Sequence, residues 1–102
     1  MKPVGLYAEL VKCDSLDLPS IYDYISDEAY DGKEKIVSYL KNGIEDCVAP
    51  GRALDCFNGE VIENKLCGMN DGEFCWQSDL LYYVEKYNLR LEKEFEKKVL
   101  SN

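Results

Sequence analysis

The chain has 102 residues, of which 46% are hydrophobic and 31% are charged, so it can fold as one domain and is too apolar for intrinsic disorder. It carries 20 acidic and 12 basic residues, a net charge of −8, and such a field repels phosphate backbones and argues against a nucleic-acid partner. Histidine is absent, which argues against a serine or cysteine hydrolase of the triad type.

The first predicted element is a short helix near residue 21. Pro19 and Ser20 stand ahead of Ile21, Tyr24 and Ile25, which have the spacing of one helix face. Beyond this helix, turn dipeptides divide the chain at four places: Asp31-Gly32, Asn42-Gly43, Asn58-Gly59 and Asp71-Gly72.

The segment "DGKEKIVSYLKNG", residues 31 to 43, predicts the clearest helix. Asp31 can cap its first turn, and Glu34 lies three residues on, as in a capping box. Asn42-Gly43 is expected to end the helix with a left-handed residue. The apolar stripe that faces the core consists of Ile36, Val37, Tyr39 and Leu40.

The middle of the chain predicts a small antiparallel sheet. Residues 44–49 have the pattern of a strand and lead into a Pro-Gly turn. The Asp71-Gly72 dipeptide predicts a hairpin between two further strands, at about 62–70 and 73–77. The intervening residues, 50–61, fit either a strand or a structured loop.

Two helices are expected to follow the sheet. Ser78 is placed to cap the first of them, and Asp79 lies in its first turn, where a negative charge complements the helix dipole. Its predicted inner face consists of Leu80, Tyr83, Val84 and Tyr87. The last helix has a narrow apolar stripe of Leu91, Phe95 and Val99.

Together these elements predict a single α+β domain spanning residues 1–102. Two N-terminal helices precede a three-stranded antiparallel sheet, and two C-terminal helices pack against one sheet face. Phe74 and Trp76 share a strand face directed at those helices, so most aromatic residues are assigned to the core. The aromatic residues left for binding are Tyr22, Tyr30 and Tyr82.

Neither targeting nor metal binding is indicated by the remaining patterns. No apolar run approaches the roughly 20 residues of a spanning helix, and the start lacks the pattern of a secretion signal. Five cysteines without a C-x-x-C pair favour reduced thiols and a cytoplasmic location. Four of them could supply zinc thiolates, but they lack the closely spaced pairs of a structural zinc site, so zinc binding is disfavoured and no cofactor is expected: Cys47, Cys56, Cys67 and Cys75.

The stretch "DGEFCWQSDLLYYVEKYNLRL", residues 71–91, preceded by "APGRALDCFNGE", residues 49–60, resembles a group of small uncharacterised bacterial proteins. These proteins share an Asp-Gly dipeptide, an aromatic residue and the pattern W-x-x-D-L-x-Y-Y-V-x-x-Y. The resemblance implies a bacterial, cytoplasmic protein and assigns no catalytic residue. A looser resemblance connects the chain to the small acidic immunity proteins of bacterial toxin systems.

The leading hypothesis is a non-enzymatic interaction protein, immunity-like in role, whose acidic sheet and loop region binds a basic protein. Residues 44–79 hold eight acids, Glu45, Asp46, Asp55, Glu60, Glu63, Asp71, Glu73 and Asp79, against two bases, Arg52 and Lys65. Binding to such a region should weaken as salt rises. The candidate partner-binding residues are Tyr82, Glu45, Asp46, Asp55, Glu60, Glu63 and Glu73.

Two other hypotheses stay open at this point. One is an enzyme or small-ligand-binding domain with a carboxylate-lined cleft near Trp76, which predicts a pocket that joins Trp76 or Tyr82 to acids of perturbed pKa. The other is a homodimer formed through an exposed aromatic helix face that includes Tyr82. Neither a membrane partner nor a nucleic-acid partner is expected.

Overall fold

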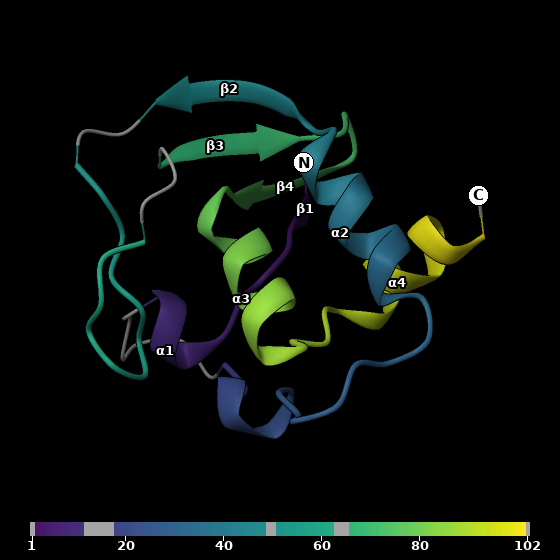
Figure 1. Ribbon diagram of the computed structural model, residues 1–102. Coiled ribbons are helices and arrows are strands. Elements are labelled where there is room, and N and C mark those ends of the chain that lie inside the picture. Colours follow the sequence, from purple (N-terminus) through teal and green to yellow (C-terminus); the bar gives the residue numbers. More distant parts are fainter. Residues whose placement is uncertain (1, 12–17, 49–50, 63–65, 102) are drawn as a thin grey trace.

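A computed structural model describes residues 2–11, 18–48, 51–62 and 66–101 (Figure 1). In chain order its elements are β1 (Lys2–Pro3), α1 (Ala8–Val11), the single 3-10 turn η1 (Ile21–Asp23), α2 (Lys33–Lys41), β2 (Ile44–Val48), β3 (Cys67–Asn70), β4 (Phe74–Gln77), α3 (Asp79–Tyr87) and α4 (Lys93–Leu100). The result is one α+β domain. None of the helices in the described ranges is long and apolar enough to cross a membrane.

The sheet has four strands in the order β1-β4-β3-β2, so the expected three-stranded antiparallel sheet is wrong. β2, β3 and β4 pair antiparallel, and β1 adds a parallel strand beside β4. The N–H groups of Lys2 and Val4 donate to the carbonyls of Glu73 and Cys75, at 2.9 and 2.8 Å. Pro3 has no N–H to offer and is tolerated at this edge. A strand of two residues shows no alternation, so the sequence pattern could not reveal it.

The strand expected at 62–70 is shorter in the structure. β3 begins only at Cys67, and residues 63–65 lie outside the described ranges, as do residues 49 and 50. The described part of the open segment, 51–61, is a structured loop closed by an isolated antiparallel bridge between Leu54 and Val61. The Ile62 N–H donates to the Ala53 carbonyl at 2.9 Å and supports this closure.

One expected helix cap is wrong, and a second is at the expected residue but makes a different side-chain hydrogen bond. The N-cap of α2 is Gly32 rather than Asp31, with φ of 88°, and a Cβ there would lie 2.6 Å from Cδ2 of Leu100. The glycine therefore permits the left-handed turn and lets α4 approach. Ser78 is the N-cap of α3, as expected, but its hydroxyl makes no capping bond to the helix and instead accepts the Cys67 N–H at 2.9 Å, which joins the helix start to β3.

The end of α2 also differs from the expectation. Asn42 closes the helix with φ of −93°, so no left-handed residue is used there. Gly43 serves a different purpose, because a Cβ at this position would lie 2.6 Å from Cζ2 of Trp76. The glycine thus lets the chain pass directly over the indole ring as it enters β2.

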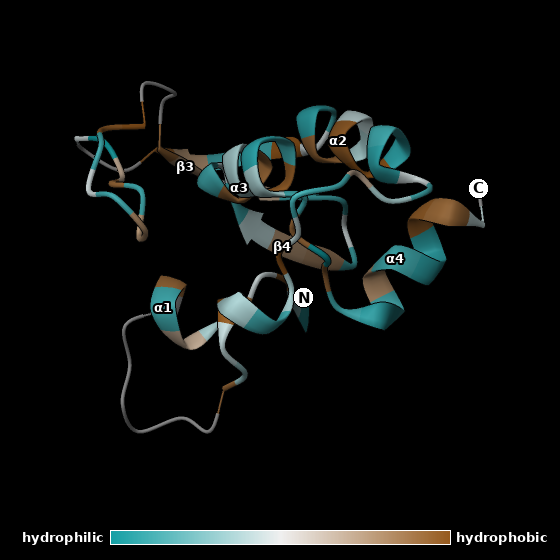
Figure 2. Cartoon of the chain, turned by 60° about the horizontal axis from the view of Figure 1, so that its bottom comes forward, coloured by the Kyte–Doolittle hydropathy of each residue, from teal (hydrophilic) through white to brown (hydrophobic). Residues whose placement is uncertain are grey.

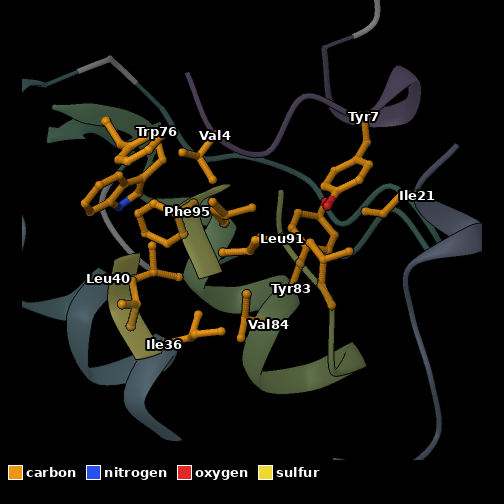
Figure 3. Close-up of a cluster of buried hydrophobic side chains, with 14 of the residues drawn as sticks. Val4, Tyr7, Ile21, Ile36, Leu40, Trp76, Tyr83, Val84, Leu91 and Phe95 are labelled. Carbon is orange, nitrogen blue, oxygen red and sulfur yellow. The ribbon is translucent and has the colours of Figure 1, made fainter. Parts of the chain in front are cut away.

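The core fills the space between the sheet and the helices. Figure 2 shows α2 and α3 side by side on one side of β4, with α1 on the other. Figure 3 shows the buried side chains, with Trp76, Phe95 and Leu40 at one end and Tyr7, Ile21 and Tyr83 at the other. The predicted inner face of α3 is confirmed for Leu80, Tyr83 and Val84, and the last stripe for Leu91, Phe95 and Val99.

The Asp71-Gly72 hairpin between β3 and β4 is confirmed, and its aspartate holds several groups at once. Oδ1 of Asp71 accepts the N–H groups of Glu73 and Phe74, at 2.8 and 2.6 Å. Oδ2 accepts the Tyr39 hydroxyl and lies 2.9 Å from Nζ of Lys98. Burial acts to raise the Asp71 pKa, but these hydrogen bonds outweigh it and hold the pKa well below 3.8.

Replacing Asp71 should therefore change how stability depends on pH. An Asp whose pKa is lowered by folding contributes stability that is present above its ordinary pKa and is lost as pH falls. Asp71→Asn is expected to lose about 2 kcal/mol of unfolding free energy at neutral pH, and the difference from the parent should shrink below pH 3.8. Urea unfolding followed by circular dichroism measures both values.

The matched control is Glu73→Gln. Glu73 is the neighbouring acid, lies 3.0 Å from the same Lys98 and is exposed to solvent, so its loss should change the unfolding free energy by about 0.5 kcal/mol or less. A difference between Asp71→Asn and the parent that stays constant as pH falls would contradict the role given to the Asp71 carboxylate.

Candidate functional site

A cavity of about 410 Å³ lies against the sheet. Residues of β2, β3 and β4 line it, together with the segment that follows β1, Leu10 of α1 and the start of α3. Sites for small molecules commonly measure about 300 to 1,000 Å³, so this space is large enough for one.

The open floor of the cavity comes from a glycine on β3. Gly68 lies opposite Cys47 of β2 and Gln77 of β4, so these three positions share one sheet face. A Cβ at Gly68 would lie 3.0 Å from Sγ of Cys47 and 3.9 Å from Oδ1 of Asp46. A side chain here would therefore crowd Sγ of Cys47 and narrow the floor of the cavity.

Two carboxyl groups line the same cavity, from different elements. Asp46 of β2 is exposed, and its Oδ2 accepts the side-chain amide of Asn70 at 2.9 Å. Asp79 in the first turn of α3 is half-buried, and burial raises its pKa above 3.8 despite a hydrogen bond from its own backbone N–H. None of the described residues that line the cavity is Lys or Arg. The electrostatics of the cavity therefore suit a cation.

A second candidate surface is the outer edge of β2. In the described sheet this strand pairs only with β3, and all five of its residues are exposed. Ile44 and Val48 are 62% and 60% exposed, and Glu45 and Asp46 add two carboxylates. The pairing register shifts between Glu45 and Cys47, as at a β-bulge. An apolar and acidic edge strand is therefore presented to solvent.

Comparisons with known proteins found no match among protein-family models, curated proteins or solved structures. The resemblance to small bacterial proteins and to immunity proteins thus stays a prediction. An α+β fold carries no function by itself, because one architecture can host many chemistries.

The structure places Asp55 inside the protein, in contrast to the other candidate partner-binding acids that it describes. Asp55 is 1% exposed, and its Oδ2 accepts the hydroxyls of Tyr82 and Tyr87, each at 2.6 Å. Oδ1 accepts the Phe57 N–H at 2.8 Å, and Nζ of Lys86 lies 3.8 Å from Oδ2. Burial acts to raise the Asp55 pKa, but the tyrosine hydroxyls and the Phe57 N–H outweigh it and lower the pKa below 3.8. Asp55 therefore joins the 51–62 loop to α3.

The Tyr82 side chain makes contacts within the domain and does not project freely into solvent. It is half-buried, and in addition to its bond to Asp55 its hydroxyl accepts a hydrogen bond from Lys86 at 3.0 Å. Its neighbour Tyr83 donates to the Leu54 carbonyl at 3.2 Å and accepts the Cys56 N–H at 2.9 Å. The tyrosines of α3 thus bind the loop of their own chain.

The other candidate acids are exposed where the structure describes them. Glu45 and Asp46 lie together on β2, while Glu60 lies 3.9 Å from Lys86 and Glu73 pairs with Lys98. Glu63 lies outside the described residues. The candidates therefore do not form one patch, and β2 holds the two that are adjacent.

The sequence did not predict that Asp79 and Gly68 line a cavity. Asp79 has the pattern of a helix-start acid, and Gly68 has no flanking turn signal. The cavity depends on which residues of β2 and β4 stand opposite Gly68, and that register is not visible in the sequence. Only the expectation of a carboxylate-lined cleft near Trp76 pointed to this place.

The cysteines that the structure describes do not come together as a metal site. Cys47, Cys56, Cys67 and Cys75 are free thiols, and in the described ranges no three Cys, Asp or Glu residues are arranged to hold a metal ion. Cys13 lies outside those ranges. Cys67 is buried, and burial raises the pKa of Cys56, which favours a neutral thiol there.

Removing the Asp55 carboxylate is expected to weaken the attachment of the loop to α3. Asp55→Ala leaves two tyrosine hydroxyls without their acceptor and should cost about 2 to 4 kcal/mol of unfolding free energy. Glu60→Ala, an exposed acid in the same loop, serves as the control and should cost about 0.5 kcal/mol or less. Denaturant unfolding measures both. Equal effects of the two substitutions would contradict the buried position of Asp55.

Proposed function

We propose that the chain is a non-enzymatic interaction module, immunity-like in role, which binds a basic protein by pairing the outer edge of β2 with an extended segment of that partner. The observation that carries this proposal is an exposed edge strand with two adjacent acids, Glu45 and Asp46.

Backbone groups along an exposed sheet edge can form a new ladder with an added strand, and side chains on the edge then select the partner. Ile44 and Val48 offer apolar contact at the two ends of β2. The added strand would extend the four-stranded sheet by one.

Charge favours a basic segment over a second copy of the chain. Two β2 edges that paired with each other would bring four carboxylates together, from Glu45 and Asp46 of each copy, and like charges across strands are destabilising. Charges and bulges on edge strands also oppose self-association. Lysine or arginine side chains would instead meet these acids, and the net charge of −8 would steer a basic partner toward the domain.

Most of the other acids between residues 44 and 79 contact groups of their own chain, so the proposed surface includes fewer residues than the sequence suggested. Asp55 and Asp71 are held by tyrosine hydroxyls within the fold, and Asp79 lines the cavity. Glu60 and Glu73 each lie near a lysine of the same chain. The proposed surface therefore centres on the two adjacent, exposed acids of β2 rather than on residues 44–79 as a whole.

The setting that we infer is a bacterial cytoplasm, where the free thiols of the described cysteines would stay reduced. A second candidate function, ligand binding in a carboxylate-lined cleft near Trp76, is favoured by the cavity beside that residue.

A synthetic peptide of alternating lysine and valine tests the proposed edge. Calorimetry should show binding that weakens as salt rises, because exposed charges are screened by salt. Reversal of both β2 acids, Glu45→Lys with Asp46→Lys, should weaken binding on the order of tenfold or more.

The matched control is Asp27→Lys with Glu28→Lys. These two acids are also adjacent and exposed, so their reversal changes the net charge by the same amount at a distance from β2 in the sequence. It should leave most of the affinity intact. An equal loss with both double variants, or binding that is insensitive to salt, would contradict docking at β2.

A further inference from the structure

Two fixed segments define the shape of the cavity that lies against the sheet. The chain after β1 forms one wall, and the N–H groups of Gly5 and Leu6 donate to the carboxylate of Glu92 at 3.0 to 3.1 Å. Gly5 has φ of 84°, and a Cβ there would lie 2.8 Å from Cδ1 of Leu80. The wall is therefore held by hydrogen bonds and by close packing against α3.

The opposite wall and the floor belong to the sheet. Cys75 and Gln77 of β4 lie on the same sheet face as Gly68, whereas the Trp76 ring is buried on the other face against Phe95. Leu6 and Leu10 add apolar side chains to the lining. The absence of a side chain at Gly68 leaves the floor open below Cys47. Most of the lining is therefore apolar, as in sites that hold the body of a small organic molecule.

The charged groups in this lining are carboxyl groups, which would repel an anion and attract a cation. Asp46 Oδ1 lies 3.9 Å from the position that a Cβ at Gly68 would take, so it is close to the open floor. Asp79 also lines the cavity, and its carboxyl is costly to ionise there because it is largely removed from water. An ammonium group in this cavity would supply the opposite charge, and charge-assisted hydrogen bonds to a carboxylate are among the strong ones.

We propose that this cavity binds a small organic amine, with its apolar or aromatic body against apolar side chains of the lining such as Leu6 and Leu10, and with its ammonium group toward the acids of the lining, Asp79 and Asp46. The site differs from the proposed strand pairing, because it uses a sheet face and the start of α3 rather than the outer backbone edge of β2. Asp46 belongs to both sites, whereas Asp79 and Gly68 belong only to the cavity and Glu45 only to the strand edge, so variants of these three residues distinguish a failure of one proposal from a failure of the other.

Phenethylamine is a suitable probe, because it joins one aromatic ring to one primary ammonium group. Calorimetry should show saturable binding of phenethylamine, and the fluorescence of Trp76, the only tryptophan, whose strand β4 lines the cavity, gives a second readout. Two analogues of similar size replace the ammonium group by a neutral or a negative group and so test the contribution of its charge. Phenylethanol should bind on the order of tenfold more weakly, and phenylacetate should not bind.

Two variants test the assigned residues. Asp79→Asn keeps the shape of the side chain, so it should weaken phenethylamine binding on the order of tenfold and leave phenylethanol binding unchanged. Gly68→Ala adds one methyl group to the floor and should weaken binding of both compounds, and its φ is compatible with alanine, so the strand should still form. The exposed acid Glu73, which is not in the lining, provides the control Glu73→Gln.

The expected result is amine-selective, saturable binding that Asp79→Asn and Gly68→Ala weaken and Glu73→Gln does not. Calorimetry on the same samples verifies that the fluorescence change reports binding, and circular dichroism verifies that each variant is folded. The proposal is overturned if phenethylamine gives no saturable signal, if phenylethanol binds equally well, or if Asp79→Asn binds the amine as the parent does.

Discussion

The packing of Phe95 against one face of β4 is the contact on which the rest of the structure depends. Its ring, fully buried, lies 5.3 Å from that of Phe74 and 5.6 Å from those of Trp76 and Tyr39. This cluster joins α4, α2 and β4. Because strand side chains alternate, burying Phe74 and Trp76 on the helix side places Cys75 and Gln77 on the other face. The same alternation that builds the core therefore sets the sheet side of the cavity.

Helices α2, α3 and α4 and the β3-β4 hairpin could be predicted because their signals are local, whereas α1 was not expected and the helix expected near residue 21 is only the short 3-10 turn η1. The apolar stripe of α3 and the Asp71-Gly72 turn each lie within a few residues. Strand β1 could not be predicted from the sequence, since its two residues pair with β4 across about 70 positions of the chain. The burial of Asp55 is likewise set by hydroxyls from α3, and among 20 acids nothing marks this one. The cavity floor depends on the register opposite Gly68, which is also a tertiary property.

Acidic residues in this domain have three different environments, which the net charge of −8 does not distinguish. Asp55 and Asp71 are hydrogen-bonded within the fold, and their pKa values are lowered. Asp79 has a raised pKa in the cavity. Glu45 and Asp46 are exposed on an edge strand. The first group stabilises the structure, whereas the other two underlie the proposed amine site and the proposed protein contact.

Amide chemical shifts of isotope-labelled protein, followed during separate titrations with the lysine-valine peptide and with phenethylamine, test both proposed sites most directly. The peptide is expected to shift the amides of β2, Ile44–Val48, and the amine those of Gly68, Trp76 and Asp79. Shifts that gather instead around Asp55 and Tyr82, or that are absent with both ligands, would contradict the assignment of function to the sheet edge and its cavity.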